Sequence, residues 1–209
     1  MEKMEIKKTG TTTVGLSCKD AAIIAADKKS TLGYLVGSKE TEKIMQLDEH
    51  CAMTIAGMSG DAQALARYMR AELKLFELQS NRKMPIGSVT SLLSNILQGN
   101  KFYPYYVQLI VAGYDDVGPG LFSLDPVGGS EEEKKFFSTG SGSPIALGVL
   151  EDGYREGMSA DEGVKLALRA IKAAVERDIA SGGMGVDVAV ITKEGVKITT
   201  YPFAKLRQQ

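Results

Sequence analysis

The order of the expected helices and strands limits the fold of this chain more than any other feature of the sequence. Apolar residues recur at helical spacing in two pairs of adjacent segments, and strand-like segments come before, between and after these pairs. A doubly wound parallel sheet would instead alternate single helices with single strands. The pattern therefore predicts antiparallel sheets covered by helices, and two stacked sheets between helix layers fit it best.

Four helices are expected, at residues 60–79, 85–99, 143–153 and 159–178. Pro85 suits the first helical position of the second helix, because a residue in the first turn needs no amide donor. Ser143 before Pro144 indicates a helix start with a capping hydroxyl. Ser159 and Glu162 have the spacing of a capping box, which predicts the start of the fourth helix.

Segments rich in β-branched and other apolar residues predict the strands. Residues 21–27 are nearly all apolar, which is typical of a strand covered on both faces. Residues 203–209 are expected to form a loose polar tail. The other strands are expected at residues 11–15, 31–37, 43–47, 51–57, 107–112, 121–124, 134–138, 186–192 and 196–201.

The composition indicates one soluble globular domain. The 209 residues include 25 Lys and Arg against 26 Asp and Glu, so no excess charge attracts nucleic acid or an anionic membrane. Cys18 and Cys51 lie in apolar segments, and we interpret them as buried thiols of a protein in a reducing compartment. The longest apolar run, residues 21–26, is too short to cross a bilayer. The charged residues 1–10 lack the apolar region of a signal peptide, so this leader is of another kind.

The sequence lacks the side chains that several catalytic classes need. His50 is the only histidine and lies in the charged turn 48–50, where we expect it to be solvated. A single histidine argues against a Ser-His-Asp or Cys-His site and leaves too few soft ligands for zinc. The glycine clusters at residues 57–60, 140–143 and 182–185 lack the ending of a P-loop and the full dinucleotide-binding spacing. No metal or other cofactor is therefore expected.

The remaining chemistry is that of a hydroxyl group, and residues 9–15 read Thr-Gly-Thr-Thr-Thr-Val-Gly. Gly10 permits strained backbone geometry, which suits a peptide bond that is attacked by its neighbour's side chain. Cleavage after Gly10 would leave Thr11 with a hydroxyl and a free α-amine, a known form of activated nucleophile. The amine is the better base, since its reference pKa is about 7.7–8.0, against about 10.4 for lysine. The alternative is an ordinary threonine-rich edge strand.

A lysine can assist such a nucleophile by placing positive charge beside the hydroxyl, which favours the alkoxide. Lys43 would do so if Asp27 holds and orients it. The alternatives are a turn aspartate and a surface lysine, which are the commoner fates of these residue types.

Several separate motifs make the chain similar to one known family. They are residues 11–15, Asp27, Lys43, residues 54–57 with Gly60 and Asp61, residues 138–143, residues 177–178 and residues 181–183. From Thr11 to about Lys205 the chain resembles the β subunits of the proteasome, most closely the archaeal catalytic type. The resemblance implies a four-layer αββα sandwich of the N-terminal nucleophile hydrolase class, in agreement with the expected order of elements. It also implies a propeptide, residues 1–10, removed by autolysis, and one catalytic domain over residues 11–209.

The resemblance further implies roles for individual residues. Thr11 would be the nucleophile, with Asp27 and Lys43 beside it. The N–H of Gly57 would bind the oxyanion, and Thr31 would pair with the substrate backbone. The supporting hydrogen-bond group around the terminal amine would be Ser141, Asp178 and Ser181. Each position also has a structural alternative: the glycine ends a strand, and the serines and Asp178 sit at helix ends.

A pocket for the residue before the cut is implied at Ser30, Met45, Ile55 and Ser59. Met45 and Ile55 predict an apolar pocket that favours large hydrophobic residues.

The implied function is that of a threonine endopeptidase, made as a self-processing precursor, that degrades unfolded proteins through an acyl-enzyme inside a closed chamber. The implied partners are other β subunits in seven-membered rings, an α-subunit ring, an ATPase unfoldase cap acting through that ring, and unfolded polypeptides, all in the cytoplasm. Neither nucleic acid nor a membrane is expected as a partner. One alternative is the threonine subunit of the bacterial two-component protease, which the C-terminal hairpin and tail fit less well. The other is a non-catalytic β subunit, which should lack Thr11, Lys43 or a cleavable glycine.

Overall fold

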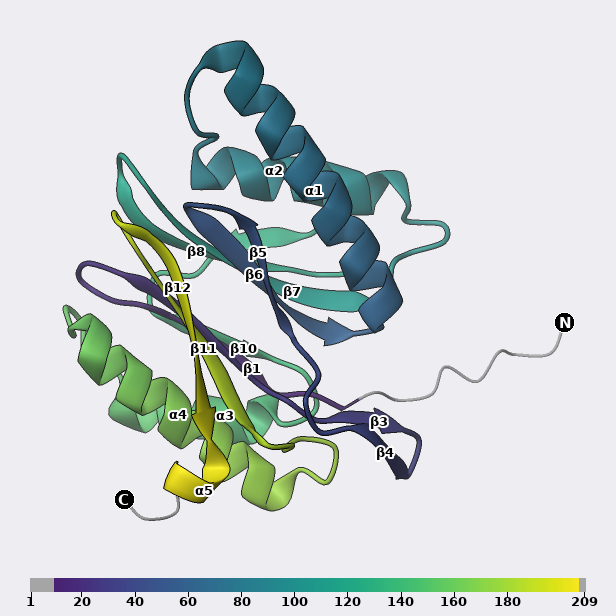
Figure 1. The fold of residues 1–209 in the computed structure, drawn as a ribbon, viewed down its shortest axis with the longest axis vertical. Coiled ribbons are helices and arrows are strands. Elements are labelled where there is room, and N and C mark those ends of the chain that lie inside the picture. Colours follow the sequence, from purple (N-terminus) through teal and green to yellow (C-terminus); the bar gives the residue numbers. More distant parts are fainter. Residues whose placement is uncertain (1–9, 207–209) are drawn as a thin grey trace, which may run out of the picture.

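Two antiparallel five-stranded sheets lie face to face, and a pair of helices covers the outer face of each sheet (Figure 1). The computed structural model describes residues 10–206 of the chain. The layers run helix, sheet, sheet, helix, so the expected αββα sandwich is confirmed. Residues 1–9, which make up most of the expected propeptide, and residues 207–209 lie outside the described residues.

The first sheet brings an N-terminal and a C-terminal segment of the chain together. Its strand order is β10-β1-β2-β11-β12, and every neighbouring pair is antiparallel. Thr13 pairs with Thr139 on one side and with Ala26 on the other, so the residues after Thr11 enter the interior of a sheet. The strands are β1 (Thr13–Ser17), β2 (Ala22–Asp27), β10 (Phe136–Thr139), β11 (Gly185–Thr192) and β12 (Gly195–Pro202).

The second sheet follows the order of the chain, β5-β6-β7-β8-β9. Its last strand was not expected, because β9 consists of three polar, exposed residues without apolar alternation. The strands are β5 (Ile44–Asp48), β6 (Cys51–Gly57), β7 (Val107–Asp115), β8 (Gly118–Leu124) and β9 (Ser130–Glu132).

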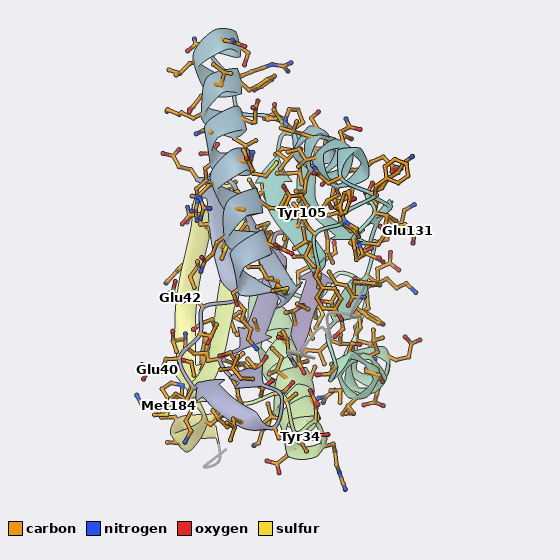
Figure 2. All side chains as sticks on the ribbon, turned by 90° about the vertical axis from the view of Figure 1, so that its right-hand side faces the viewer. Tyr34, Glu40, Glu42, Tyr105, Glu131 and Met184 are labelled. Carbon is orange, nitrogen blue, oxygen red and sulfur yellow. The ribbon has the colours of Figure 1, made fainter. Side chains whose placement is uncertain are left out.

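The strand expected at residues 31–37 is wrong, since this segment is a separate hairpin of β3 (Ser30–Leu32) and β4 (Leu35–Ser38). Gly33 has φ +63°, which lets the chain reverse between the two strands. Tyr34 at the tip is 99% exposed and projects away from the layers (Figure 2). The hairpin extends beside the point where the N-terminal segment enters β1 (Figure 1).

The apolar strand β2 is buried on both faces, as expected. Ile24 and Ala26 pack between the two sheets, whereas Ile23 and Ala25 pack under the helices of the first sheet. Side chains alternate along a strand, so a strand between two apolar layers needs apolar residues at every position. Asp27, the polar last residue of this strand, therefore lies at the edge of the core.

The helix pairs are confirmed, with changes at their ends. Pro85 precedes α2 as its N-cap rather than opening it. Gly142, not Ser143, is the N-cap of α3, and no side-chain hydrogen bond caps that helix. The capping box of Ser159 and Glu162 at α4 is confirmed. The helices are α1 (Ser59–Ser80), α2 (Ile86–Gly99), α3 (Ser143–Gly153), α4 (Ala160–Arg177) and α5 (Phe203–Leu206).

The loose tail expected from residue 203 is wrong for its first part, because α5 begins there and Phe203 packs against the core of the first sheet.

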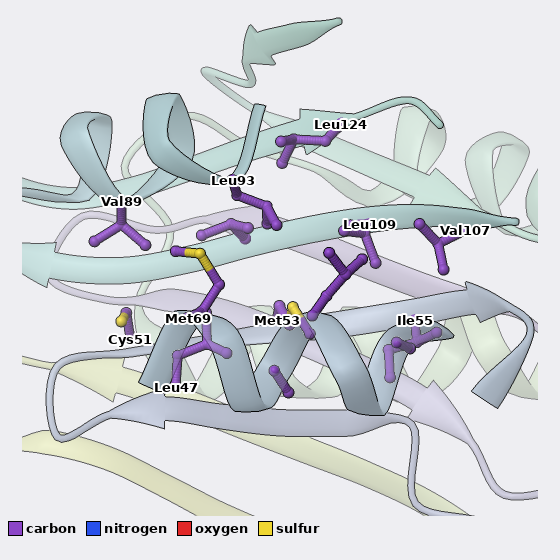
Figure 3. Packing of buried hydrophobic residues seen from close by; sticks show 14 of the residues in the cluster. Leu47, Cys51, Met53, Ile55, Met69, Val89, Leu93, Val107, Leu109 and Leu124 are labelled. Carbon is purple, nitrogen blue, oxygen red and sulfur yellow. The ribbon is translucent and has the colours of Figure 1, made fainter. Parts of the chain in front are cut away.

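The helix α1 is held on the second sheet by large apolar side chains (Figure 3). Met69 of α1, Met53 of β6 and Leu109 of β7 are fully buried in this cluster, and Leu93 of α2 joins them. Each such side chain contributes about 1.5–3 kcal/mol when it is removed from water. This packing fixes β6, and with it the backbone at Gly57.

Candidate active site

Thr11 lies two residues before the start of β1 and is only 4% exposed. Its hydroxyl donates a hydrogen bond of 2.7 Å to the carbonyl oxygen of Gly10, the residue before the expected cut. Its amide N–H donates to Ser141 Oγ at 3.2 Å. In the full chain this nitrogen is the amide of the peptide bond between Gly10 and Thr11, and cleavage of that bond would convert it to an amine.

Gly10 is packed so tightly that no side chain fits. A Cβ atom on Gly10 would lie 1.7 Å from the Cβ of Ala180. The Gly10 amide donates to Thr31 Oγ1 at 3.3 Å, so β3 contacts the segment before the expected cut. Thr31 thus contacts the backbone of the residue before the expected cut, and the contact with Ala180 explains why position 10 is a glycine.

Asp27 is fully buried, yet its carboxylate accepts hydrogen bonds on both oxygens. Oδ1 accepts the Thr12 amide at 2.9 Å and Lys43 Nζ at 2.8 Å. Oδ2 accepts the amides of Lys29 at 3.1 Å and Gly182 at 2.8 Å. A charge without such partners would not be tolerated in the interior. Asp27 therefore holds Lys43, and the interpretation as a simple turn aspartate is wrong.

Lys43 precedes β5 and is 5% exposed, so it is not a surface lysine. Burial lowers the pKa of its ammonium group, while the charges of Asp27 and Asp178 oppose this shift and the charge of Lys29 adds to it. Desolvation penalises the charged form of a lysine, so its proton is released more readily than in water. The site therefore contains a buried, oriented cation that can also exchange a proton.

Ser141, Asp178 and Ser181 come from two loops and form one hydrogen-bonded group. Ser141 Oγ and Ser181 Oγ each donate to Asp178 Oδ2 at 2.6 Å. Ser141 lies between β10 and α3, and Asp178 is the C-cap of α4. Neither serine caps a helix, but Asp178 does lie at a helix end, as the structural alternative had it. Through Ser141 the group reaches the Thr11 nitrogen.

Gly57 ends β6 with φ +133°, a conformation that L side chains rarely adopt. A Cβ atom here would also lie 2.1 Å from the carbonyl oxygen of Tyr106. Gly57 lines a pocket of about 240 Å³ together with Tyr106, Gly140 and Ser141. The pocket adjoins Thr11, because a Cβ on Gly140 would lie 2.1 Å from the Thr11 carbonyl oxygen. A small ligand group can therefore sit between the Gly57 backbone and Ser141.

The residues expected to line the pocket before the cut lie on four elements. Ser30 begins β3, beside Thr31, and Ser59 begins α1, where it is exposed. Met45 of β5 and Ile55 of β6 both contact the apolar cluster beneath α1 and α2. Ile55 is therefore a core residue, and Met45 is partly buried against the same core.

Sequence reasoning missed four residues that shape the site: Thr12, Lys29, Ala180 and Gly182. Lys29 Nζ donates to the carbonyl oxygens of Ile179 and Ser181, which holds the loop that carries Ser181. Only the position of Thr12 directly after Thr11 was visible as a signal. Gly182 lies within the motif of residues 181–183, but its contact with Asp27, like the contacts of Lys29 and Ala180, depends on which distant segments meet.

The expectation that His50 is a solvated turn residue is wrong. Its side chain is 12% exposed, and its Nε2 lies 2.8 Å from the Met84 carbonyl oxygen, to which it donates. His50 lies in the turn between β5 and β6, at the opposite end of β6 from Gly57. Across residues 10–206, no group of three or more His, Cys, Asp or Glu side chains is arranged to hold a metal ion. No helix in this part of the chain is long and apolar enough to span a membrane.

Known proteins support one family. Residues 7–191 match the family described as Proteasome subunit. A proteasome subunit beta of Methanocaldococcus jannaschii is 55% identical over 196 residues, which cover 93% of this chain and 87% of the relative. The same protein of Methanococcus maripaludis is 50% identical over 190 residues, covering 90% and 86%. That of Methanoregula boonei is 48% identical over 193 residues, covering 92% and 90%.

The family match agrees with the sandwich of two sheets, and the alignments with the β-subunit relatives cover most of each relative's length. The chain therefore belongs to the proteasome subunit family, as a β subunit of its threonine-type peptidase class.

Proposed function

We propose that the chain is the self-processing precursor of a catalytic β subunit, which cleaves peptide bonds with Thr11 at its own N-terminus. One observation carries this proposal. The Thr11 hydroxyl lies 2.7 Å from the Gly10 carbonyl oxygen, and the Thr11 nitrogen contacts the group of Ser141, Asp178 and Ser181. Nucleophile, scissile bond and supporting polar groups are thus assembled before any cut.

The first reaction removes residues 1–10. Thr11 Oγ1 attacks the carbonyl carbon of Gly10, so an O–C bond forms and the C–N bond of the peptide breaks. The hydroxyl proton passes to the Thr11 nitrogen, which leaves as a free amine. Water then hydrolyses the ester, releasing Gly10 with a carboxylate and restoring the Thr11 hydroxyl. Holding the reacting groups in one buried site supplies much of the rate acceleration.

The second reaction is hydrolysis of substrate peptides. The neutral Thr11 amine, directly or through a water, takes the hydroxyl proton as the oxygen attacks the substrate carbonyl. The Gly57 N–H is proposed to bind the oxyanion. The amine then protonates the leaving group. Water hydrolyses the ester of the acyl-enzyme, which releases the acyl product as a carboxylate and restores the Thr11 hydroxyl. Lys43, oriented by Asp27, stabilises the developing alkoxide by its positive charge.

The position of Thr31 supports a substrate-binding role. Its hydroxyl already accepts the Gly10 amide, which stands where the backbone of a substrate residue before the cut would lie. Ser30, Met45, Ile55 and Ser59 are proposed to line the adjacent pocket, with Met45 and Ile55 favouring large hydrophobic residues.

We further propose the assembly that the family name carries. Seven-membered β rings would pair with α-subunit rings, and an ATPase cap would unfold the polypeptide substrates before they enter the closed chamber. The particle would work in the cytoplasm without a cofactor. Exposed apolar side chains on the hairpin β3–β4, such as Tyr34 and Leu35, suit burial against a neighbouring subunit.

The test is the variant Thr11→Ala, with Thr11→Ser as the matched control that keeps both hydroxyl and amine. We expect Thr11→Ala to keep its fold, retain residues 1–10 by intact mass, and hydrolyse no peptide after assembly with α rings. Thr11→Ser should lose the leader and keep measurable activity. Wild-type activity in Thr11→Ala would refute the mechanism. A wild-type chain whose mass never changes under assembly conditions would instead indicate a subunit that only builds the ring.

A further inference from the structure

Thr12, the residue after the nucleophile, contacts two polar groups that otherwise lie apart. It is fully buried. Its amide N–H donates to Asp27 Oδ1 at 2.9 Å, on the side of Lys43. Its hydroxyl oxygen lies 2.7 Å from Ser181 Oγ, on the side of Asp178. One residue thus connects the pair of Asp27 and Lys43 with the group around the Thr11 nitrogen.

The direction of the hydroxyl bond follows from the neighbouring contact. Ser181 has one hydroxyl proton and donates it to Asp178 Oδ2 at 2.6 Å. Its oxygen is therefore left to accept, so Thr12 is the donor. A chain of donors runs from Thr12 through Ser181 to Asp178, and Ser141 donates to the same carboxylate oxygen from the other side.

Gly142 leaves room for the Thr12 hydroxyl. A Cβ atom on Gly142 would lie 2.0 Å from Thr12 Oγ1, so the absence of a side chain there makes room for the hydroxyl. The next residue differs. Thr13 Oγ1 bonds to Thr139 Oγ1 at 2.6 Å and accepts from Thr54 Oγ1 at 3.2 Å, without reaching Asp178. Thr13, the next residue and the first of β1, is therefore a natural control.

We infer that Thr12 is a positioning residue for the proposed threonine protease reaction, acting through Ser181 on the Asp178 carboxylate, which Ser141 links to the Thr11 nitrogen. This inference rests on the proposed function. The donated hydrogen bond orients Ser181 and strengthens its bond to Asp178 Oδ2, which lowers the negative charge on the oxygen that Ser141 also contacts. The Thr12 amide keeps the nucleophile's strand aligned with Asp27 and Lys43.

The charge on Asp178 matters because the Thr11 amine must be neutral to act as a base. The charges of Asp27, Asp178 and Lys29 act on Lys43, and Ser141 links Asp178 to the Thr11 nitrogen. Removing the Thr12 hydroxyl returns negative charge to Asp178 Oδ2, which favours the ammonium form of the amine. The low-pH side of the profile of kcat/KM against pH, where the amine loses its proton, then moves to higher pH.

The experiment compares Thr12→Val, which loses the hydroxyl at nearly constant shape, with Thr12→Ser, which keeps it. In the assembled enzyme we expect Thr12→Val to lower kcat about 3- to 10-fold, the effect of one lost neutral hydrogen bond. The acid limb of kcat/KM should shift up by about half a pH unit. Thr12→Ser should keep the wild-type pH profile. Thr12→Ala, the second variant without a hydroxyl, should repeat the shift if Thr12→Val assembles poorly.

Two comparisons isolate the cause. Thr13→Val also loses a buried hydroxyl and should leave the acid limb in place. On a Ser181→Ala background, Thr12→Val should add no further shift, because the connecting hydroxyl is gone. An unchanged acid limb in both Thr12→Val and Thr12→Ala, or an equal shift in Thr13→Val, overturns the inference. Thr11→Ala separates this from the proposed function, since activity in that variant would refute the threonine mechanism whatever Thr12 does.

Discussion

Gly10 and Ala180 are in such close contact that a Cβ atom on Gly10 would lie 1.7 Å from the Cβ of Ala180. Ala180 belongs to the loop between Asp178 and Ser181, so the residue before the expected cut packs against the group that holds the Thr11 nitrogen. Glycine at position 10 is thus a steric requirement of the uncut chain.

The first prediction concerns this contact. Gly10→Ala should slow loss of residues 1–10 by roughly 100-fold, because the added methyl displaces the scissile bond from Thr11. The measurement is intact mass against time after assembly. The double variant Gly10→Ala with Ala180→Gly should recover only part of the rate, because a Cβ atom on Gly10 would still lie 2.8 Å from the Cα of residue 180. Gly87→Ala, where a Cβ meets nothing within 4 Å, serves as the neutral glycine control. Unchanged cleavage in Gly10→Ala would mean that the contact does not position the bond.

The second prediction concerns the buried pair of Asp27 and Lys43. Lys43→Met should lower peptide hydrolysis about 100-fold or more, because the nucleophile loses its adjacent positive charge. It should also lower the free energy of unfolding by about 3 kcal/mol, the lower end for a broken buried pair. The loss stays small since the amides of Thr12, Lys29 and Gly182 still bind Asp27.

The matched control is Lys28→Met, which breaks another largely buried pair, Lys28 with Asp187. That variant should lose stability in urea unfolding and keep its hydrolytic activity. Equal loss of activity in both variants would show that Lys43 acts through stability alone.

The third prediction concerns Gly57. Gly57→Ala should lower the free energy of unfolding by about 3 kcal/mol, through strain at φ +133° and a clash with the Tyr106 carbonyl. Any residual enzyme should have a strongly reduced kcat, since the backbone N–H moves. Gly118→Ala has a similar φ of +122° with open space around it, so it tests strain without the clash. Wild-type kcat in Gly57→Ala would remove Gly57 from the oxyanion role.

The fourth prediction concerns the free, buried thiols of Cys18 and Cys51. Burial raises the pKa of each from 9.0 to about 12. Neither thiol should react with a disulfide reagent at pH 8 until the protein unfolds, because thiolate is the reactive form. Keeping the thiols neutral stabilises the fold fully below pH 9, and this contribution is lost as pH rises toward 12. Rapid labelling of the native protein would contradict the burial of these groups.

Much of the architecture was predictable because it depends on local patterns. The paired helices, the doubly buried strand β2 and the capping box at Ser159 all follow from periodicity or from residues within one turn of each other. The errors fell where a distant contact or a single backbone angle decides. The positive φ of Gly33 allows a hairpin where one strand was expected, and the side chain of His50 is shielded from solvent where it contacts the Met84 carbonyl oxygen.

The sequence by itself determined the chemistry that this protein can use: a threonine after a glycine, one histidine, and an aspartate and a lysine at fixed separations from Thr11. Residue types and short spacings are properties of the chain, so they can be recognised without coordinates. Only the tertiary structure decided that Asp27 holds Lys43, that Thr12 joins Ser181, and that Ala180 excludes a side chain from position 10. These contacts join residues up to 170 positions apart, and such pairs meet only when the sheets and their loops have packed.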